Sequence, residues 1–163
     1  MAVTAYVGLG ANLGDPILTI RSALDALHRL RDTQLVRHSS LFVSAPVDAG
    51  GNDFINAVAQ LETALDASSL LTELQNIELA FGRERPFRNA PRTLDLDLLL
   101  YDQLKTHSDT LELPHPRMSG RAFVLLPLLE LDPDIHIPGK GPAKNYLEAV
   151  ADQEIRPLPE QAS

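Results

Sequence analysis

The sequence over positions 92–101 reads Arg92-Thr93-Leu94-Asp95-Leu96-Asp97-Leu98-Leu99-Leu100-Tyr101. Because successive side chains of a strand point to opposite faces, this stretch predicts a strand with leucines on one face and Asp95 and Asp97 on the other. Two carboxylates in so apolar a run are costly to bury without a positive partner. The segment directly before the strand supplies such partners, since residues 83, 85, 88 and 92 are all arginine. A carboxylate pair beside a basic segment favours a site that binds a metal ion and phosphate groups.

The length and composition of the chain fit a single domain with a substantial core. The chain has 163 residues, of which 44% are hydrophobic, so we expect one domain over residues 1–163. The formal net charge is −8 and no basic stripe is evident, which disfavours nucleic acid as a partner. The sequence contains no cysteine, which excludes disulfides, thiolate metal sites and a cysteine nucleophile.

Nothing in the sequence indicates a membrane or secretory segment. The first eight residues lack a basic region and include a glycine, unlike a signal peptide. The longest apolar run, from Ala122 to Leu129, is far too short to span a bilayer. We therefore expect a cytoplasmic protein that makes no membrane contact, binds small molecules and acts as a monomer. We expect its tail from about residue 152 to be loosely ordered.

Hydrophobic periodicity and breaker residues predict alternating strands and helices over the first hundred residues. The predicted elements are, in order, a strand over 4–10, a helix from 16 to about 31, strands over 35–44 and 54–63, a helix between 66 and 82, and the strand of the opening stretch. This β-α-β-β-α-β order predicts an α+β protein with the ferredoxin-like fold, in which an antiparallel sheet carries both helices on one face. A C-terminal extension follows, with a small hairpin over 103–113 and short helices over 122–130 and 146–151.

The two aspartates are the first candidates for chemistry. At a rise of about 3.3 Å per residue their Cα atoms would lie roughly 6.7 Å apart, so their carboxylates could converge on two metal ions. Oxygen ligands favour magnesium. The alternative is a pair of surface aspartates, each paired with an arginine. The neighbouring arginines favour phosphate binding, because guanidinium groups match phosphate oxygens.

Other polar and aromatic residues extend this candidate site. Phe54 and Asn56 share a strand face, where an aromatic plane and a carboxamide could bind a flat polar heterocycle; a core phenylalanine and a strand-end asparagine are the alternative. Gln75 and Glu78 lie three apart on a predicted helix, and surface polarity explains them as well as ligand contact does. The glycines at 8, 10 and 14 do not have the spacing of a dinucleotide-binding loop, and the sequence has no Walker A motif.

Five motifs together resemble the hydroxymethyldihydropterin pyrophosphokinase family. They are Gly8-Leu9-Gly10-Ala11-Asn12-Leu13-Gly14-Asp15, Phe54-Ile55-Asn56-Ala57, Ile77-Glu78-Leu79 with Gly82-Arg83, Pro91-Arg92-Thr93-Leu94-Asp95-Leu96-Asp97, and Pro114-His115-Pro116-Arg117-Met118 with Arg121-Ala122-Phe123. The resemblance runs from about residue 4 to about residue 150. It implies a ferredoxin-like enzyme of folate biosynthesis. Such an enzyme transfers pyrophosphate from ATP to the hydroxymethyl group of 6-hydroxymethyl-7,8-dihydropterin and releases AMP.

The resemblance also implies a role for each candidate residue. Asp95 and Asp97 would hold two magnesium ions, while Arg83 and Arg92 would grip the phosphates and stabilise the transition state. The ATP site would comprise Gln75, Glu78, Arg83, Arg85, Arg92, His115 and Arg121. The pterin site would comprise Ala45, Pro46, Val47, Phe54, Asn56, Asp95 and Phe123, with the two phenylalanines on either side of the ring.

The chain departs from the family pattern in two loops. The loop before the Pro-Arg-Thr motif often carries a tryptophan in the family, whereas this chain has none. The stretch from Ala45 to Asp53 looks shortened, and Ala45 stands where threonine is more usual. Two alternatives therefore remain open: a catalytically weakened relative, and a ferredoxin-like regulatory module that binds a nucleotide without chemistry.

Overall fold

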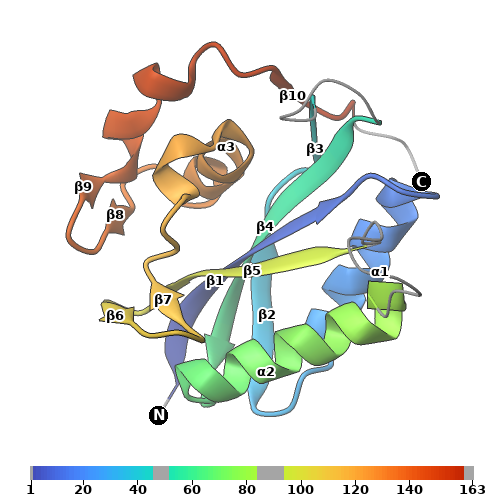
Figure 1. The fold of residues 1–163 in the computed structure, drawn as a ribbon, viewed down its shortest axis with the longest axis vertical. Coiled ribbons are helices and arrows are strands. Elements are labelled where there is room, and N and C mark those ends of the chain that lie inside the picture. The colour runs from blue at the N-terminus through green and yellow to red at the C-terminus, as the bar shows by residue number, and fades with distance from the viewer. Residues whose placement is uncertain (1, 46–51, 84–93, 160–163) are drawn as a thin grey trace.

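The computed structural model describes residues 2–45, 52–83 and 94–159, with no description of the Arg83 side chain. Its centre is an antiparallel sheet of six strands (Figure 1). The strands are β1 (Val3–Ala11), β2 (Thr33–His38), β3 (Phe42–Ser44), β4 (Phe54–Thr63), β5 (Asp95–Tyr101) and β10 (Ile155–Pro157). Their spatial order is β10-β3-β4-β1-β5, and β2 pairs with another part of β4. Together with the helices, this sheet makes the protein α+β, as predicted.

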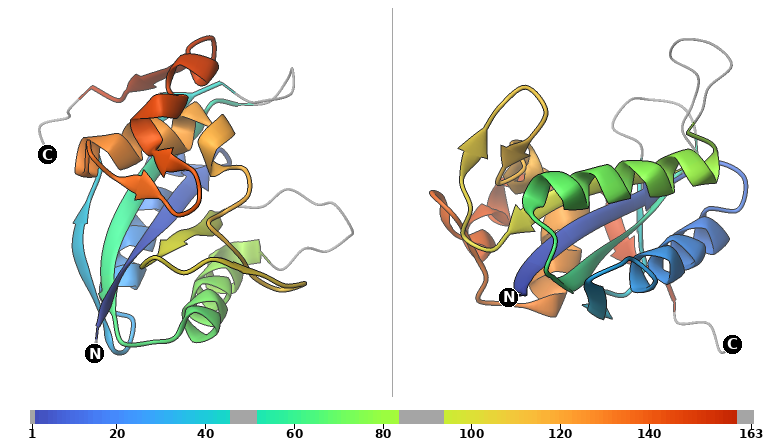
Figure 2. Two further views of the ribbon diagram at one scale, coloured as in Figure 1. Left: turned by 90° about the vertical axis from the view of Figure 1, so that its left-hand side faces the viewer. Right: turned by 90° about the horizontal axis from the view of Figure 1, so that it is seen from below.

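Helices cover the two faces of the sheet differently (Figures 1 and 2). α1 (Pro16–His28) and α2 (Ala67–Glu78) pack on one face, where their leucines meet inward side chains such as Val7 and Leu96. α3 (Ala122–Leu131) packs on the other face, against Tyr6 and Leu99 among others. Since strand residues alternate between faces, the central strands β1, β4 and β5 contribute to both cores.

The predicted helix starts are confirmed. The Asp15 side chain accepts a hydrogen bond from the Leu18 N–H at the start of α1, and the Asp66 side chain accepts one from the Ser69 N–H at the start of α2. These carboxylates satisfy N–H groups that have no partner within the helix. At the other end of α2, a short π-helical turn, η1 (Leu79–Arg83), contains Gly82 with φ of +90°. A positive φ of this kind favours glycine.

One predicted strand proved to be two. The sequence predicted a continuous strand over 35–44, but the chain leaves regular pairing between β2 and β3. Ser39, which is buried, lies at the break. Its N–H donates to the Val58 carbonyl, and its Oγ accepts from the Val58 N–H at 3.0 Å. The Ser39 hydroxyl thus replaces a backbone acceptor, so the chain can bend while the Val58 N–H of β4 keeps a hydrogen-bond partner.

The C-terminal extension contains several further short elements. They are the hairpin β6 (Thr106–His107) with β7 (Glu112–Leu113), the pair β8 (His136–Ile137) with β9 (Gly141–Pro142), and the short 3-10 helices η2 (Met118–Gly120), η3 (Ala143–Tyr146) and η4 (Glu148–Val150). The tail expected to be loose from about residue 152 contributes β10, which pairs with β3. Among the described residues, no helix is long and apolar enough to cross a membrane.

The register of β1 with its neighbours shapes the sheet face on which α3 packs. Gly10 lies between Asp95 of β5 and Asn56 of β4, and Gly8 lies opposite Asp97. α3 packs farther along this face, so the glycine end of the strands keeps space above it.

Candidate active site

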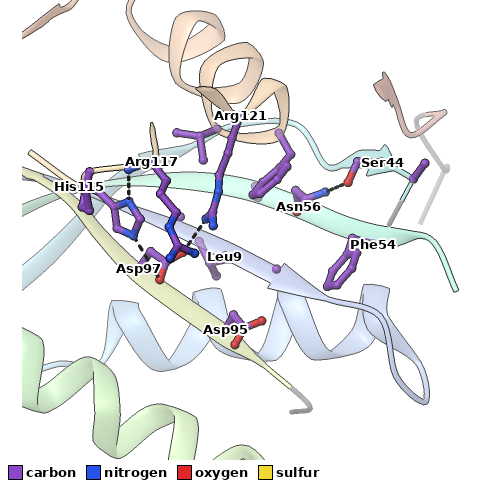
Figure 3. A pocket seen from close by; sticks show the side chains of 16 residues that line it. Leu9, Ser44, Phe54, Asn56, Asp95, Asp97, His115, Arg117 and Arg121 are labelled. Carbon is purple, nitrogen blue, oxygen red and sulfur yellow. Dashed lines mark hydrogen bonds and ion pairs between the residues drawn. The ribbon is translucent and has the colours of Figure 1, made fainter. Parts of the chain in front are cut away.

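A cavity of about 530 Å³ lies above these glycines, between the sheet and the segment that leads into α3 (Figure 3). Its lining comes from β1, β3, β4, β5 and the segment 115–124, which are far apart in the sequence. The lining residues are Gly8, Leu9, Gly10, Ser44, Ala45, Phe54, Asn56, Ala57, Asp95, Asp97, His115, Pro116, Arg117, Arg121, Phe123 and Val124. The cavity is therefore polar at the β5 side and partly aromatic at the β4 side.

Asp97 lies at the centre of the charged side of the cavity (Figure 3). His115 Nε2 lies 3.9 Å from one carboxylate oxygen of Asp97, and Arg121 Nη1 lies 3.8 Å from the other. Both distances exceed a normal hydrogen bond, so both contacts are loose, and the one with Arg121 is an ion pair. Asp97 keeps 41% of its side chain exposed, so its oxygens remain accessible to a ligand in the cavity.

The surroundings of His115 determine its protonation. The Arg117 backbone N–H donates a hydrogen bond to His115 Nδ1 at 3.2 Å. Because Nδ1 is the acceptor, it carries no proton, and the ring proton on Nε2 faces Asp97. Burial lowers the pKa of His115 below its usual 6.5; Asp97 opposes this shift, whereas Arg121 and Arg117 add to it. His115 is therefore neutral at pH 7 and presents one N–H donor to the cavity.

The opposite side of the cavity combines aromatic rings with a fixed amide. Asn56 is buried, and its Nδ2 donates to the Ser44 hydroxyl at 2.6 Å. This bond fixes the orientation of the amide, so Oδ1 points toward Gly10, where an added Cβ would lie 3.4 Å from that oxygen. Phe54 lines the same side, and Phe123 lies under the Arg121 guanidinium at 5.3 Å from the ring centroid. A cation at this distance from a ring is a favourable contact.

The donor set fits magnesium ions that are shared with a phosphate ligand. Asp95 and Asp97 project into one cavity from the same strand face. Within the described ranges, no three His, Asp or Glu side chains converge as a metal site. Magnesium typically binds one or two carboxylates and completes its shell with waters and substrate phosphates. The two aspartates would supply the protein's part of such a site.

Comparison with known proteins identifies the family. The family model for 7,8-dihydro-6-hydroxymethylpterin-pyrophosphokinase (HPPK) matches residues 6–133. A 2-amino-4-hydroxy-6-hydroxymethyldihydropteridine pyrophosphokinase of Pseudomonas aeruginosa is 43% identical over 160 residues, which cover 98% of this chain and 99% of the relative. The chain belongs to the HPPK family. A pyrophosphokinase of the same name from Haemophilus influenzae is 40% identical over 154 residues, covering 94% of this chain and 96% of the relative.

Two solved structures with the same fold are longer proteins. An HPPK-DHPS crystallised in complex with substrates aligns with a TM-score of 0.71 at 11% identity, over 91% of this chain. The wild-type HPPK-DHPS of Plasmodium falciparum with pteroate aligns with a TM-score of 0.73 at 12% identity, over 93% of this chain. This HPPK-family chain spans 43% and 45% of those two chains. At such low identity the likeness concerns the fold alone.

The structure brings together most of the predicted site residues that it describes. Those that line the cavity are Ala45, Phe54, Asn56, Asp95, Asp97, His115, Arg121 and Phe123. Two predicted ATP contacts on α2 are not among the residues that line this cavity: Gln75 is exposed, and the buried Glu78 accepts a hydrogen bond from the Leu96 N–H at 2.9 Å. The remaining predicted residues lie outside the description, namely Pro46, Val47, Arg85, Arg92 and the side chain of Arg83.

The sequence prediction missed two polar residues of the HPPK cavity. Arg117 lines the cavity beside His115; it is part of a motif that resembles the family, so its position was a usable signal. Ser44 was predicted only as the end of a strand. Its role as the hydrogen-bond partner of Asn56 depends on the pairing of β3 with β4, for which the local sequence holds no signal.

Proposed function

We propose that this chain transfers pyrophosphate from ATP to the hydroxymethyl group of 6-hydroxymethyl-7,8-dihydropterin in folate biosynthesis, and that the cavity above Gly8 and Gly10 is where it does so. The observation that carries the proposal is the cavity's division into two sides. Asp95 and Asp97 lie on one side, and Phe54, Asn56 and Phe123 lie on the other. A metal-phosphate site and a site for a flat heterocycle thus share one space, as transfer between two substrates requires.

The aromatic side of the cavity binds the pterin in this proposal. Phe54 and Phe123 stack on the two faces of the ring, since aromatic faces favour such contacts. Asn56 forms a hydrogen bond with the polar edge of the ring. Because the Asn56 NH₂ is held by Ser44, Oδ1 is oriented to accept a hydrogen bond from a ring N–H or amino group. A fixed acceptor of this kind discriminates against rings that lack the donor.

The charged side binds ATP and two magnesium ions. Asp95 and Asp97 would be the protein ligands, and bound magnesium would neutralise the triphosphate and polarise the phosphorus under attack. His115 donates its Nε2 proton to a phosphate oxygen, and Arg121 exchanges its loose contact with Asp97 for a phosphate. Arg83, Arg85 and Arg92, with Gln75 and Glu78, complete the ATP site in this proposal, and Ala45, Pro46 and Val47 complete the pterin site.

The reaction needs positioning more than covalent assistance. The pterin hydroxyl oxygen forms a bond to the β-phosphorus as the bond between that phosphorus and the α-β bridging oxygen breaks. AMP leaves with the electron pair, and the hydroxyl proton is released. Cationic donors around the phosphates stabilise the charge that develops, and the two-sided cavity holds the reacting atoms in line.

The proposal includes a fold family and a cellular setting. We take the first six core elements as a ferredoxin-like βαββαβ unit, supported by the antiparallel order of β3, β4, β1 and β5. We also take the enzyme to be a cytoplasmic monomer. In support of the monomer, the exposed large hydrophobic side chains come from separate places in the described chain, namely Leu18, Val36, Leu79, Leu104 and Leu147.

A product analysis tests the proposed reaction. The protein is incubated with ATP, magnesium and 6-hydroxymethyl-7,8-dihydropterin, and the nucleotides are resolved by ³¹P NMR. We expect AMP to form only when the pterin is present, and EDTA to abolish its formation. ADP as the product would indicate transfer of a single phosphoryl group, and nucleotide binding without AMP would favour a regulatory module. Either result would overturn the proposal.

A further inference from the structure

Gln153, in the C-terminal segment, is bonded to the backbone on both sides of Arg121. Its Oε1 accepts a hydrogen bond from the Ala122 N–H at 2.9 Å, and its Nε2 donates to the Gly120 carbonyl at 3.0 Å. One side-chain amide therefore holds the two peptide groups that flank Arg121. Gln153 lies beyond residues 6–133, the part of the chain that the family model matches.

These two bonds determine how the chain enters α3. Arg121 is the N-cap residue of α3 and has an extended backbone, with φ of −125° and ψ of 113°, but its side chain makes no capping hydrogen bond. The first N–H groups of a helix need partners outside the helix, and Gln153 supplies one for Ala122. The Arg121 side chain is then free to reach Asp97 and to lie over the Phe123 ring.

The same segment also holds the opposite wall of the cavity. The Ala45 N–H donates to the Glu154 carbonyl, and Ile155 pairs with Ser44 where β10 lies beside β3 (Figure 1). Ser44 in turn orients the Asn56 amide. Three consecutive residues, 153–155, thus contact the backbone on either side of Arg121 and, across the cavity, the backbone of Ser44 and Ala45.

Gln153 itself is anchored to the core. Its own N–H donates to the Val150 carbonyl at 3.0 Å, and Val150 is buried in the core around α3. The amide is therefore presented from a fixed backbone, even though the side chain lies near the surface.

We infer that Gln153 is a positioning residue for the substrate cavity, acting through the backbone of Arg121 to place the Arg121 guanidinium and the Phe123 ring. This inference rests on the proposed function, since its kinetic consequence is a loss of pyrophosphate transfer. Small displacements of groups that orient substrates are costly, because the reacting atoms must be held in line.

Kinetics of two Gln153 variants and a neighbouring control test the inference. Gln153→Ala removes both bonds, whereas Gln153→Glu keeps the acceptor for the Ala122 N–H and loses the donor to Gly120. We expect kcat/KM to fall about tenfold in Gln153→Ala and by less in Gln153→Glu. Asp152→Ala is the control, because Asp152 is exposed and its side chain makes no hydrogen bond or ion pair within the described residues. Circular dichroism and urea unfolding confirm that all variants are folded at the assay temperature.

A second measurement does not depend on turnover. We expect the Ala122 amide to exchange with deuterium faster in Gln153→Ala than in the wild type, and to keep its protection in Gln153→Glu and Asp152→Ala. Unchanged exchange at Ala122, or unchanged kcat/KM in both Gln153 variants, would overturn the inference; so would an equal kinetic loss in Asp152→Ala. A wild-type protein that forms no AMP would instead refute the proposed function, and faster Ala122 exchange would then still report that Gln153 holds this segment.

Discussion

At the scale of single residues, Asp97 is the point where the charged groups of the cavity meet. We expect Asp97→Ala to lower kcat by at least about a hundredfold, because in the proposed mechanism it removes a ligand for the magnesium ions that hold the phosphates. The fold should survive, since the contacts of Asp97 with His115 and Arg121 are loose and partly exposed. Steady-state kinetics and circular dichroism measure the two effects, with Asp109→Ala, an exposed aspartate outside the cavity lining, as the control. If Asp97→Ala unfolds, the residue has a structural role instead.

Replacing Phe123 should affect the affinities for the two substrates differently. We expect Phe123→Ala to weaken pterin binding roughly tenfold to a hundredfold, because stacking on an aromatic ring contributes about 1–3 kcal/mol per base-like ring. ATP binding should change much less. Isothermal titration with the pterin and with a non-hydrolysable ATP analogue gives both affinities. Equal losses for the two ligands would reject the assignment of Phe123 to the pterin side.

Residues of the site could be predicted from sequence where a local pattern orients them. The period of two along β5 and β4 directs Asp95, Asp97, Phe54 and Asn56 to one sheet face, and all four line the cavity. The role of Gln153 could not be predicted in this way. It depends on a contact between segments about thirty positions apart, and a lone glutamine carries no signal for such a contact.

At the scale of elements, Glu78 connects α2 to β5. Its buried carboxylate accepts the Leu96 N–H between the two aspartates, so Glu78→Ala leaves a buried donor unsatisfied. We expect a loss of about 1–3 kcal/mol in the free energy of unfolding, measured with urea. Glu73→Ala on the same helix is the matched control, because within the described residues the Glu73 carboxylate contacts only the exposed Arg31 as an ion pair, and such pairs contribute less than about 1 kcal/mol. Equal losses would contradict the connecting role.

Asp66 should make the start of α2 sensitive to pH. The backbone hydrogen bond from Ser69 lowers the pKa of Asp66 below its usual 3.8, so the unfolded state binds the proton more readily than the folded state. The Asp66 carboxylate therefore stabilises the folded state above pH 3.8, and this stabilisation is lost as the pH falls through the lowered pKa. Asp66→Asn keeps a capping oxygen without the charge. We expect the Tm of the wild type to be about 1–3 °C higher than the Tm of Asp66→Asn at pH 6. This difference in Tm should narrow toward pH 3. A gap independent of pH would contradict this account.

The elements themselves could be predicted to different degrees. The helix starts at Asp15 and Asp66 follow from residue types with a direct role at helix ends. The division of the predicted strand 35–44 could not be foreseen, because it depends on the Ser39 hydroxyl reaching the backbone of β4. Serine within an alternating run does not by itself indicate a break.

At the scale of the whole molecule, the position of α3 explains why a cavity exists. α3 covers the part of the sheet face that carries Tyr6, Val58 and Leu99 and leaves the part above Gly8 and Gly10 open. The order of the core elements could be predicted from sequence periodicity. The placement of α3 could not, since its almost entirely apolar sequence fits any buried site and its direction is fixed by long-range packing.

The central claim is that one cavity holds both substrates with their reacting groups between the aspartates and the aromatic rings. A crystal structure with α,β-methylene ATP, magnesium and 6-hydroxymethylpterin tests it most directly. We predict the pterin ring between Phe54 and Phe123 with its edge at Asn56, and magnesium bound to Asp95 and Asp97 and to the phosphates. A pterin or triphosphate bound outside this cavity, or phosphates held without metal at the two aspartates, would contradict the account.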